Sequence, residues 1–316
     1  MSPLLLEEKR LHSEIRHLLT EKNALLLAHY YQDESIQDLA DFIGDSLELA
    51  KRASESSRDL IIFCGVHFMA ETVKAINPDK RVIVPDLDAS CSLAESCTAD
   101  AYDAFARQHP DCVRITYINS SLEVKGMSDV VCTSSNAENV IRSVPADKSI
   151  LFAPDKNLGK YLAQKTGRDL LLWDGACAVH EAFELDKIID LVRENPGASI
   201  IAHPESPASI LELAVFVGST SALLRYVVED VVQTYIVATE AGILHKMRQL
   251  VPKKKLIPAP VAEDNTCACS ECAYMKMNTL QKLYDCIAME GPEIRVDEAQ
   301  RKKALEPIRR MLEFTA

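Results

Sequence analysis

The sequence predicts an α/β fold of three tandem, similar αβα units, whose short parallel sheets surround a pseudo-threefold axis. Two observations lead to this prediction. Short apolar segments recur along the chain, and alignment on His29, Tyr117 and His203 gives offsets of 88 and 86 residues. Helix-like stretches separate these segments, and continuous apolar runs are typical of parallel strands that are covered on both faces.

The first two expected strands of each unit align without gaps. The first strands end in polar or aromatic residues: LLLAHYY (25–31), VRITYIN (113–119) and SIIAHPE (199–205). The second strands end in a hydroxyl residue: DFIGDS (41–46), DVVCTS (129–134) and VFVGST (215–220). This agreement favours an internal repeat over the approximate periodicity of any α/β protein.

The third and fourth expected strands keep the same alignment. The third strands are IIFCG (61–65), SILFA (149–153) and TYIVAT (234–239). The fourth strands are RVIVPD (81–86), LLLWD (170–174) and KLIPAP (255–260). Each unit is therefore about 87 residues long, which lies within the usual range for a domain.

Amphipathic helices are expected outside the repeats, at about residues 4–22 and 296–314. The spacing of Ile308, Met311 and Leu312 predicts that the C-terminal helix docks one apolar face on the body. We expect three domains: residues 1–97 with the N-terminal helix and first unit, residues 98–180 with the second unit, and residues 181–316 with the third unit and the C-terminal helices.

The composition excludes several classes of partner. The chain has 316 residues and a net charge of −12, without a basic stripe, so nucleic acid is not expected to bind. No apolar run reaches the roughly 18 residues of a membrane helix, and the N-terminus lacks the features of an export signal. We expect a cytoplasmic monomer or homodimer. In a reducing compartment its ten cysteines are candidates for metal or redox chemistry.

Three cysteines occur once per unit, in the loop after the last strand. Cys91 and Cys177 each precede a proline by 19 residues, and Cys272 precedes one by 20. Three thiolates from distant loops suit either zinc or an iron–sulfur cluster, and a cluster with three protein ligands leaves one iron open. Cys267 and Cys269, in CACSEC, are either a local redox pair or an alternative ligand set.

Polar residues at the ends of the first strands are the candidate site. Ligands bind at the carboxyl ends of parallel strands, so a threefold arrangement brings these residues to one cavity. The aligned residues are His29, Tyr117 and His203 and, two positions later, Tyr31, Asn119 and Glu205. This set supplies acids, bases and hydrogen-bond donors for proton transfer. We interpret His67, His180 and His245 as structural or solvent-facing.

Three hydroxyl residues, Ser46, Ser134 and Thr220, are each expected to begin a helix. Helix N-termini present free N–H groups to anions, so these residues are candidates for binding carboxylate or phosphate oxygens. Simple capping of the helix is the alternative, and both roles can coexist.

The chain resembles the quinolinate synthase family over nearly its full length. The segments that carry the resemblance include LLLAHYYQ, VPDLDASCSLAESC, VRITYINSSLEVK, LLWDGACAVHEAF, IIAHPES, FVGSTS and CACSECAYMKMNTLQKLYD. The resemblance implies three α/β domains around a pseudo-threefold axis. It also implies one [4Fe–4S] cluster held by Cys91, Cys177 and Cys272, with one open iron acting as a Lewis acid.

The resemblance further implies an activity in NAD biosynthesis. Iminoaspartate, supplied by an aspartate-oxidising enzyme, and dihydroxyacetone phosphate would condense to quinolinate, phosphate and two waters. Tyr117, His203 and Glu205 would manage proton transfers, and His29 and Tyr31 would position the triose phosphate or its product. Carboxylate or phosphate oxygens would bind to Asn119, Ser46, Ser134 and Thr220.

Two other functions remain open at the level of sequence. One is a different iron–sulfur hydro-lyase, which would dehydrate a small hydroxy acid without a triose phosphate. The other is a non-enzymatic metal- or redox-sensing protein built on CACSEC. The regular spacing of Cys91, Cys177 and Cys272 argues against the sensor.

Overall fold

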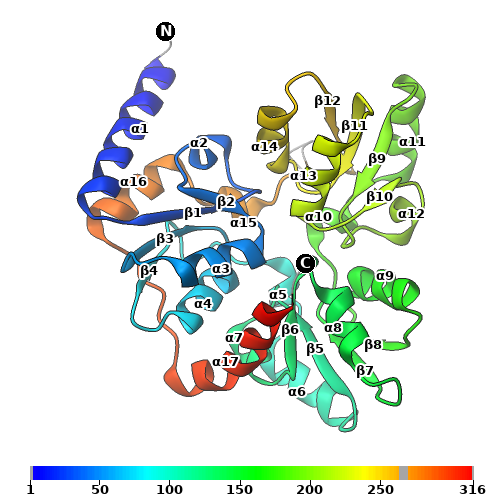
Figure 1. The fold of residues 1–316 in the computed structure, drawn as a ribbon. Coiled ribbons are helices and arrows are strands. Elements are labelled where there is room, and N and C mark those ends of the chain that lie inside the picture. The colour runs from blue at the N-terminus through cyan, green and yellow to red at the C-terminus, as the bar shows by residue number, and fades with distance from the viewer. Residues whose placement is uncertain (1–2, 263–269, 315–316) are drawn as a thin grey trace.

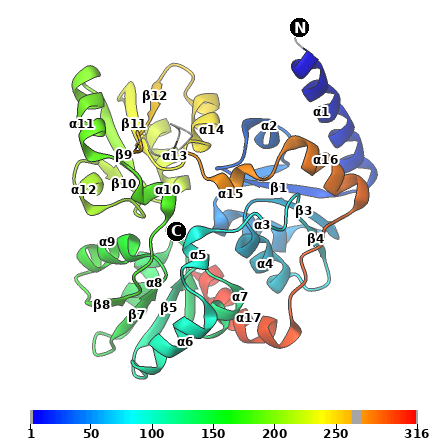
Figure 2. The same ribbon diagram turned by 180° about the vertical axis from the view of Figure 1, so that it is seen from behind.

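The computed structural model describes residues 3–262 and 270–314. Figure 1 shows three lobes of mixed helix and strand around a common centre, and Figure 2 shows the same arrangement from behind. None of the described helices combines the length and apolar character needed to cross a membrane.

Each lobe contains one four-stranded parallel sheet, and the three sheets have the same strand order: second, first, third, fourth. The first sheet comprises β1 (Leu25–His29), β2 (Phe42–Gly44), β3 (Leu60–Cys64) and β4 (Arg81–Ile83). The second comprises β5 (Val113–Tyr117), β6 (Val130–Cys132), β7 (Ile150–Ala153) and β8 (Leu170–Leu172). The third comprises β9 (Ser199–Ala202), β10 (Phe216–Val217), β11 (Thr234–Ala238) and β12 (Lys255–Pro258). All twelve expected strands and the predicted α/β class are confirmed.

The strands form because their side chains are apolar on both faces. In β1, Leu25 and Leu27 pack into one core cluster, while Leu26 and Ala28 pack into another on the opposite face. Alternate side chains of a strand point to opposite faces, so burial on both faces requires a continuous apolar run.

The helices also repeat, in five sets of three. The first four sets are α2 (Glu34–Gln37), α7 (Leu122–Gly126) and α12 (Ala208–Leu211); α3 (Ser46–Glu55), α8 (Ala137–Ser143) and α13 (Thr220–Glu229); α4 (His67–Ile76), α9 (Lys156–Thr166) and α14 (Ile243–Leu250); α5 (Ser92–Glu95), α10 (Ala178–Glu181) and α15 (Ala273–Lys276). The fifth set is α6 (Ala99–Arg107), α11 (Leu185–Glu194) and α16 (Leu280–Met289). The helices of this fifth set connect the three sheets into a ring.

Each helix of the fifth set packs on the sheet that comes next around the ring. Tyr102 of α6 shares a core cluster with Leu151 of the second sheet, and Ile188 of α11 packs in the third. Leu283 and Ile287 of α16 pack against the first sheet, although α16 follows the third unit in sequence. Figure 1 accordingly shows α16, in orange, beside the blue elements of the N-terminal lobe. The third unit therefore closes the ring onto the first.

The terminal helices dock on this ring. Helix α1 (Pro3–Glu21) packs against α16 and buries Ile15 completely. Helix α17 (Glu298–Glu313) packs against α7, β6 and α4, and so spans the first and second units. Ile308 and Met311 are fully buried in its interface, and Leu312 packs at the edge of the same core, which confirms the predicted docking face.

Candidate functional site

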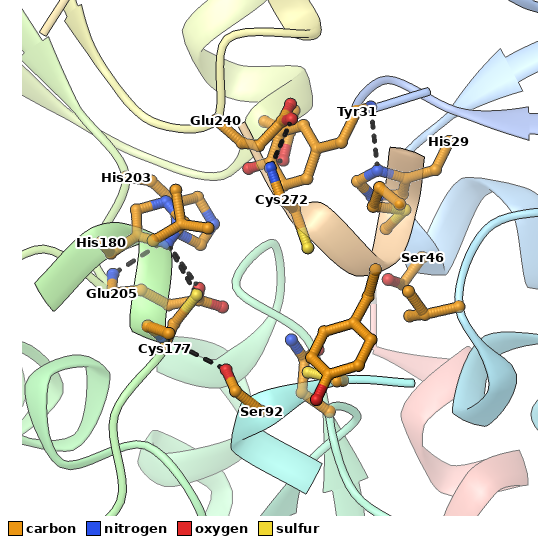
Figure 3. A pocket seen from close by; sticks show the side chains of 18 of the residues that line it. His29, Tyr31, Ser46, Ser92, Cys177, His180, His203, Glu205, Glu240 and Cys272 are labelled. Atoms are coloured by element: carbon orange, nitrogen blue, oxygen red, sulfur yellow. Dashed lines mark hydrogen bonds and ion pairs between the residues drawn. The ribbon is translucent and has the colours of Figure 1, made fainter. Parts of the chain in front are cut away.

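A cavity of about 590 Å³ lies where the three units and α15 meet. Figure 3 shows side chains from several elements of the ring pointing into it. All twelve residues that the sequence singles out line the cavity: His29, Tyr31, Ser46, Cys91, Tyr117, Asn119, Ser134, Cys177, His203, Glu205, Thr220 and Cys272. The cavity lies at the carboxyl ends of the first strands, where parallel sheets place their ligands.

Glu205 joins the second and third units in the lining of the cavity. The hydroxyl of Tyr117, the last residue of β5, donates a hydrogen bond to Glu205 Oε1 at 2.6 Å. His180 Nδ1 lies 3.0 Å from the other carboxylate oxygen. Burial alone would raise the pKa of Glu205, but His180, His203 and the Tyr117 hydroxyl outweigh it and lower the pKa. The carboxylate is therefore ionised at neutral pH and can accept a proton.

Two of the three first-strand ends carry a buried imidazole. Burial lowers the pKa of both His29 and His203 to about 4, so both rings are neutral at neutral pH. The backbone N–H of Tyr31 donates to His29 Nδ1 at 3.2 Å, and that of Glu205 donates to His203 Nδ1 at 3.4 Å. Each ring therefore carries its proton on Nε2. His203 Nε2–H donates to Ser134 Oγ at 3.0 Å.

A chain of hydroxyl groups connects the third unit to the first. The Tyr31 hydroxyl lies 2.7 Å from Thr239 Oγ1 and 3.4 Å from Thr220 Oγ1. Thr239 Oγ1 lies 3.0 Å from His180 Nε2. Because each hydroxyl can both donate and accept, this chain can reverse its direction and move a proton between Tyr31 and His180.

The sequence did not place His180 in the site, where the structure buries it between Cys177, Glu205 and Thr239. Its position three residues after Cys177 is the signal that could have identified it, because residues at i and i+3 face the same way on a helical turn.

Glu240 was also not identified from the sequence. It lines the cavity and accepts hydrogen bonds from the backbone N–H of Cys272 at 3.0 Å and of Gly242 at 2.7 Å. Figure 3 shows the Cys272 contact. Burial raises the pKa of Glu240 to about 7. The signal was the polar pair Thr239–Glu240 at a strand end where the first unit has Gly65–Val66 and the second Ala153–Pro154.

The three hydroxyl residues line the cavity, but only two begin a helix. Ser46 is the first residue of α3 and Thr220 of α13. The prediction that Ser134 begins a helix is wrong, because α8 starts at Ala137. The side chain of Asn136 accepts a hydrogen bond from the backbone N–H of Thr133 at 2.8 Å, and the resulting turn delays the helix.

The three units also meet at one carboxylate beside the cavity. Asp45 caps α3 by accepting hydrogen bonds from the backbone N–H groups of Leu47 and Glu48. Its other oxygen accepts from Ser135 Oγ of the second unit at 2.8 Å and from Ser221 Oγ of the third at 2.7 Å. Asp45 therefore ties the three units together at this end of the cavity.

The three predicted cysteine ligands occupy equivalent places in the ring. Cys91, Cys177 and Cys272 immediately precede α5, α10 and α15, and all three line the cavity. Burial raises the pKa of Cys91 to about 12 and that of Cys272 to about 11. Negative charge on Cys272 and Glu205 further raises the pKa of Cys91, and negative charge on Glu240 further raises that of Cys272.

Burial, then the charges of Glu205 and Cys91, also raise the pKa of Cys177. The raised pKa values keep the three groups as neutral thiols until a cationic group binds and stabilises their thiolate forms. The donor set therefore fits a metal centre. Cys267 and Cys269 lie outside the described residues.

Among the described residues, the ligand atoms of Cys177, His180 and Glu205 lie within 4.8 Å of one another. Cys91, Cys177 and Cys272 come from three separate loops of the ring and line one cavity, an arrangement that also suits a larger centre in which each thiolate binds a different iron.

A family model and the sequences of known proteins both relate this chain to the same family. A family model described as "Quinolinate synthetase A protein" matches residues 13–313. A quinolinate synthase of Microcystis aeruginosa is 54% identical over 305 residues, which cover 96% of this chain and 95% of that protein. A quinolinate synthase of Chloroherpeton thalassium is 50% identical over 313 residues, which cover 99% of this chain and 97% of that protein.

Proposed function

The chain belongs to the quinolinate synthase family, and on that premise we propose that it condenses iminoaspartate with dihydroxyacetone phosphate. The products would be quinolinate, phosphate and two waters. The observation that carries the proposal is one cavity in which three cysteines from three units face Glu205, Tyr117 and two neutral imidazoles.

The proposal assigns the [4Fe–4S] cluster to Cys91, Cys177 and Cys272. Their equivalent loops, their shared cavity and the family to which the chain belongs support this assignment. When bound, a cluster with three protein ligands would supply one iron as a Lewis acid. The eight described cysteines are all free, which supports a reducing, cytoplasmic setting.

Glu205 and Tyr117 are the proposed proton-transfer pair. Glu205 is ionised and buried, so a proton taken from a substrate carbon or nitrogen would reside on one of its carboxylate oxygens. The Tyr117 hydroxyl, 2.6 Å from Oε1, can stabilise that carboxylate or donate a proton to a departing hydroxyl group. His180 holds the second carboxylate oxygen at 3.0 Å and keeps the group oriented.

The neutral imidazoles are proposed to act as hydrogen-bond donors through Nε2. A neutral donor can polarise a carbonyl without placing a second full charge beside Glu205. His29 and Tyr31 would position the triose phosphate, with their rings in edge contact at 4.5 Å between centroids.

Substrate carboxylate and phosphate oxygens would bind to Asn119, Ser46, Ser134 and Thr220. Ser46 and Thr220 are the first residues of the ten-residue helices α3 and α13 and line the cavity, so each hydroxyl can donate a hydrogen bond to a substrate oxygen.

An omission assay tests this function. Anaerobically prepared, cluster-loaded protein should form quinolinate only when both iminoaspartate and dihydroxyacetone phosphate are present. Activity on a small hydroxy acid without the triose phosphate would instead establish the alternative hydro-lyase. A loaded, folded protein without turnover on either substrate would contradict both enzyme assignments and favour the metal- or redox-sensing protein.

A further inference from the structure

A second set of metal-ligand atoms lies beside the three-cysteine set. Cys177 precedes α10, His180 lies within α10, and Glu205 follows β9. His180 Nδ1 lies 3.2 Å from Cys177 Sγ and 3.0 Å from Glu205 Oε2. His180 and Glu205 are 1% and 4% exposed. A sulfur, a nitrogen and a carboxylate oxygen therefore converge in a buried part of the cavity lining.

The distances suit one small transition-metal ion. Zinc binds sulfur at about 2.3 Å and nitrogen or oxygen at about 2.0–2.2 Å, so ligand atoms in a tetrahedral site lie roughly 3.3–3.7 Å apart. The observed separations of 3.2 and 3.0 Å are a few tenths of an ångström shorter. Small side-chain shifts would therefore open room for the ion.

The surroundings of His180 match those of a metal-bound histidine. Such a ring normally donates its other N–H to a fixed acceptor, which sets the tautomer. His180 Nε2 lies 3.0 Å from Thr239 Oγ1, whose hydroxyl also contacts Tyr31 at 2.7 Å. The Thr239 hydroxyl can turn to accept the Nε2 proton, leaving Nδ1 free for a metal.

All three side chains also line the main cavity, so the fourth position of a tetrahedral ion would face open space for a water molecule. Three protein ligands and one open position are the pattern of zinc sites that are not purely structural.

We propose that the cluster-free chain binds one divalent transition-metal ion, zinc in preference to iron(II), at Cys177, His180 and Glu205. Binding releases the Cys177 thiol proton to water, while the neutral His180 ring binds through Nδ1 and keeps its single proton on Nε2, with no change of oxidation state. Zinc stands above iron(II) in the general affinity order for such ligands. The ion excludes the [4Fe–4S] cluster because Cys177 cannot serve both. This exclusion rests on the proposed function, whereas the metal site itself does not.

Cobalt(II) titration of the full-length, cluster-free protein tests the site, with zinc competition to follow. We expect one equivalent of cobalt(II), with a charge-transfer band from a single thiolate. Cys177→Ala and His180→Gln should each weaken binding by more than about 100-fold, beyond the cost of losing an outer-shell partner. Thr239→Val should weaken it by about 10-fold. Circular dichroism checks that each variant is folded.

The matched controls are Cys91→Ala and Cys272→Ala, which should bind cobalt(II) as the unaltered chain does while failing to hold a cluster. If either control weakens cobalt binding as much as Cys177→Ala does, the ion binds at the three cysteines and the proposal is overturned. Unchanged binding by His180→Gln would overturn it as well.

Reconstitution after zinc loading tests the exclusion without relying on a folded ligand variant. The zinc-loaded chain should take up several-fold less iron and sulfide than the zinc-free chain. Equal uptake would overturn the exclusion. A chain that takes up no cluster even without zinc would contradict the proposed function, and the cobalt titration would still decide the metal site.

Discussion

The cysteine loops and the ends of the first strands both recur at equivalent positions in the three units. The cysteine loops keep the same residue in every unit, whereas the strand ends carry different residues. Each cysteine loop supplies the same residue, immediately before a four-residue helix. The first-strand ends supply His29, Tyr117 and His203, followed two positions later by Tyr31, Asn119 and Glu205. The repeat is therefore kept where three like ligands are proposed and lost where proton transfer by unlike groups is proposed.

Apart from the three cysteines, Glu205 is the residue whose replacement should lower the activity most. Replacing this ionised carboxylate by the amide in Glu205→Gln removes the proposed base, so the rate of quinolinate formation should fall about 10²–10⁴-fold. The iron and sulfide content of the variant should be unchanged, because Glu205 is one of the strand-end residues and is not one of the three proposed cluster ligands. Glu212→Gln, an exposed carboxylate nearby in sequence, is the control. Turnover by Glu205→Gln at the unaltered rate would contradict the assignment.

The two imidazoles at strand ends predict a pH dependence of stability. Their pKa of about 4 in the folded protein lies below the ordinary value of 6.5, so the unfolded chain binds more protons between these values. The free energy of unfolding should therefore fall as the pH drops from about 6.5 to 4, by up to about 3 kcal/mol per ring.

Chemical denaturation across this pH range measures the effect. His29→Gln and His203→Gln should each flatten the profile, and His17→Gln, on the exposed face of α1, should leave it unchanged. Equal pH profiles for the unaltered chain and the His203→Gln variant would show that this ring does not titrate as described.

A smaller effect, on the retention of iron, is expected at Glu240. The third unit has this carboxylate where the first unit has Val66 and the second has Pro154. Glu240→Leu removes the acceptor for the Cys272 N–H, so release of iron to a chelator should be about 10-fold faster. Glu240→Gln keeps an acceptor oxygen and should retain most of the cluster. Glu271→Gln, directly before Cys272 and 3.7 Å from Lys276, is the control. Identical iron release from all three variants would contradict a positioning role.

The smallest effect is expected at Ser46. Ser46→Ala removes one neutral hydrogen-bond donor, worth about 1 kcal/mol, so KM for the triose phosphate should rise by about 5-fold with little change in kcat. Steady-state kinetics with saturating iminoaspartate measure this. A fall in kcat without a change in KM would place Ser46 in the chemical step instead of in binding.

The strands could be predicted from the sequence because burial on both faces leaves a continuous apolar run, and because three copies of each run could be compared. The convergence of the cysteines followed from the same repeat. The start of α8 was misplaced because a side chain, Asn136, closes a turn that competes with the helix. Such local competition between side chain and backbone is not visible in an apolar pattern.

Contacts between units could not be predicted from the repeat. The packing of α16 on the first sheet joins residues more than 200 positions apart, such as Leu283 and Leu26. The hydrogen bond from Tyr117 to Glu205 joins the second and third units. His180 belongs to the site because it contacts the other carboxylate oxygen of Glu205. The repeat indicates which residues are equivalent, but tertiary packing decides which of them touch.

Iron and acid-labile sulfide analysis of Cys91→Ala, Cys177→Ala and Cys272→Ala, each prepared without oxygen, tests the central claim most directly. The three equivalent loops predict that each variant loses the cluster to a similar extent, while Cys112→Ala, outside the cavity lining, keeps it. Retention of a full cluster by any one of the three variants would contradict the account.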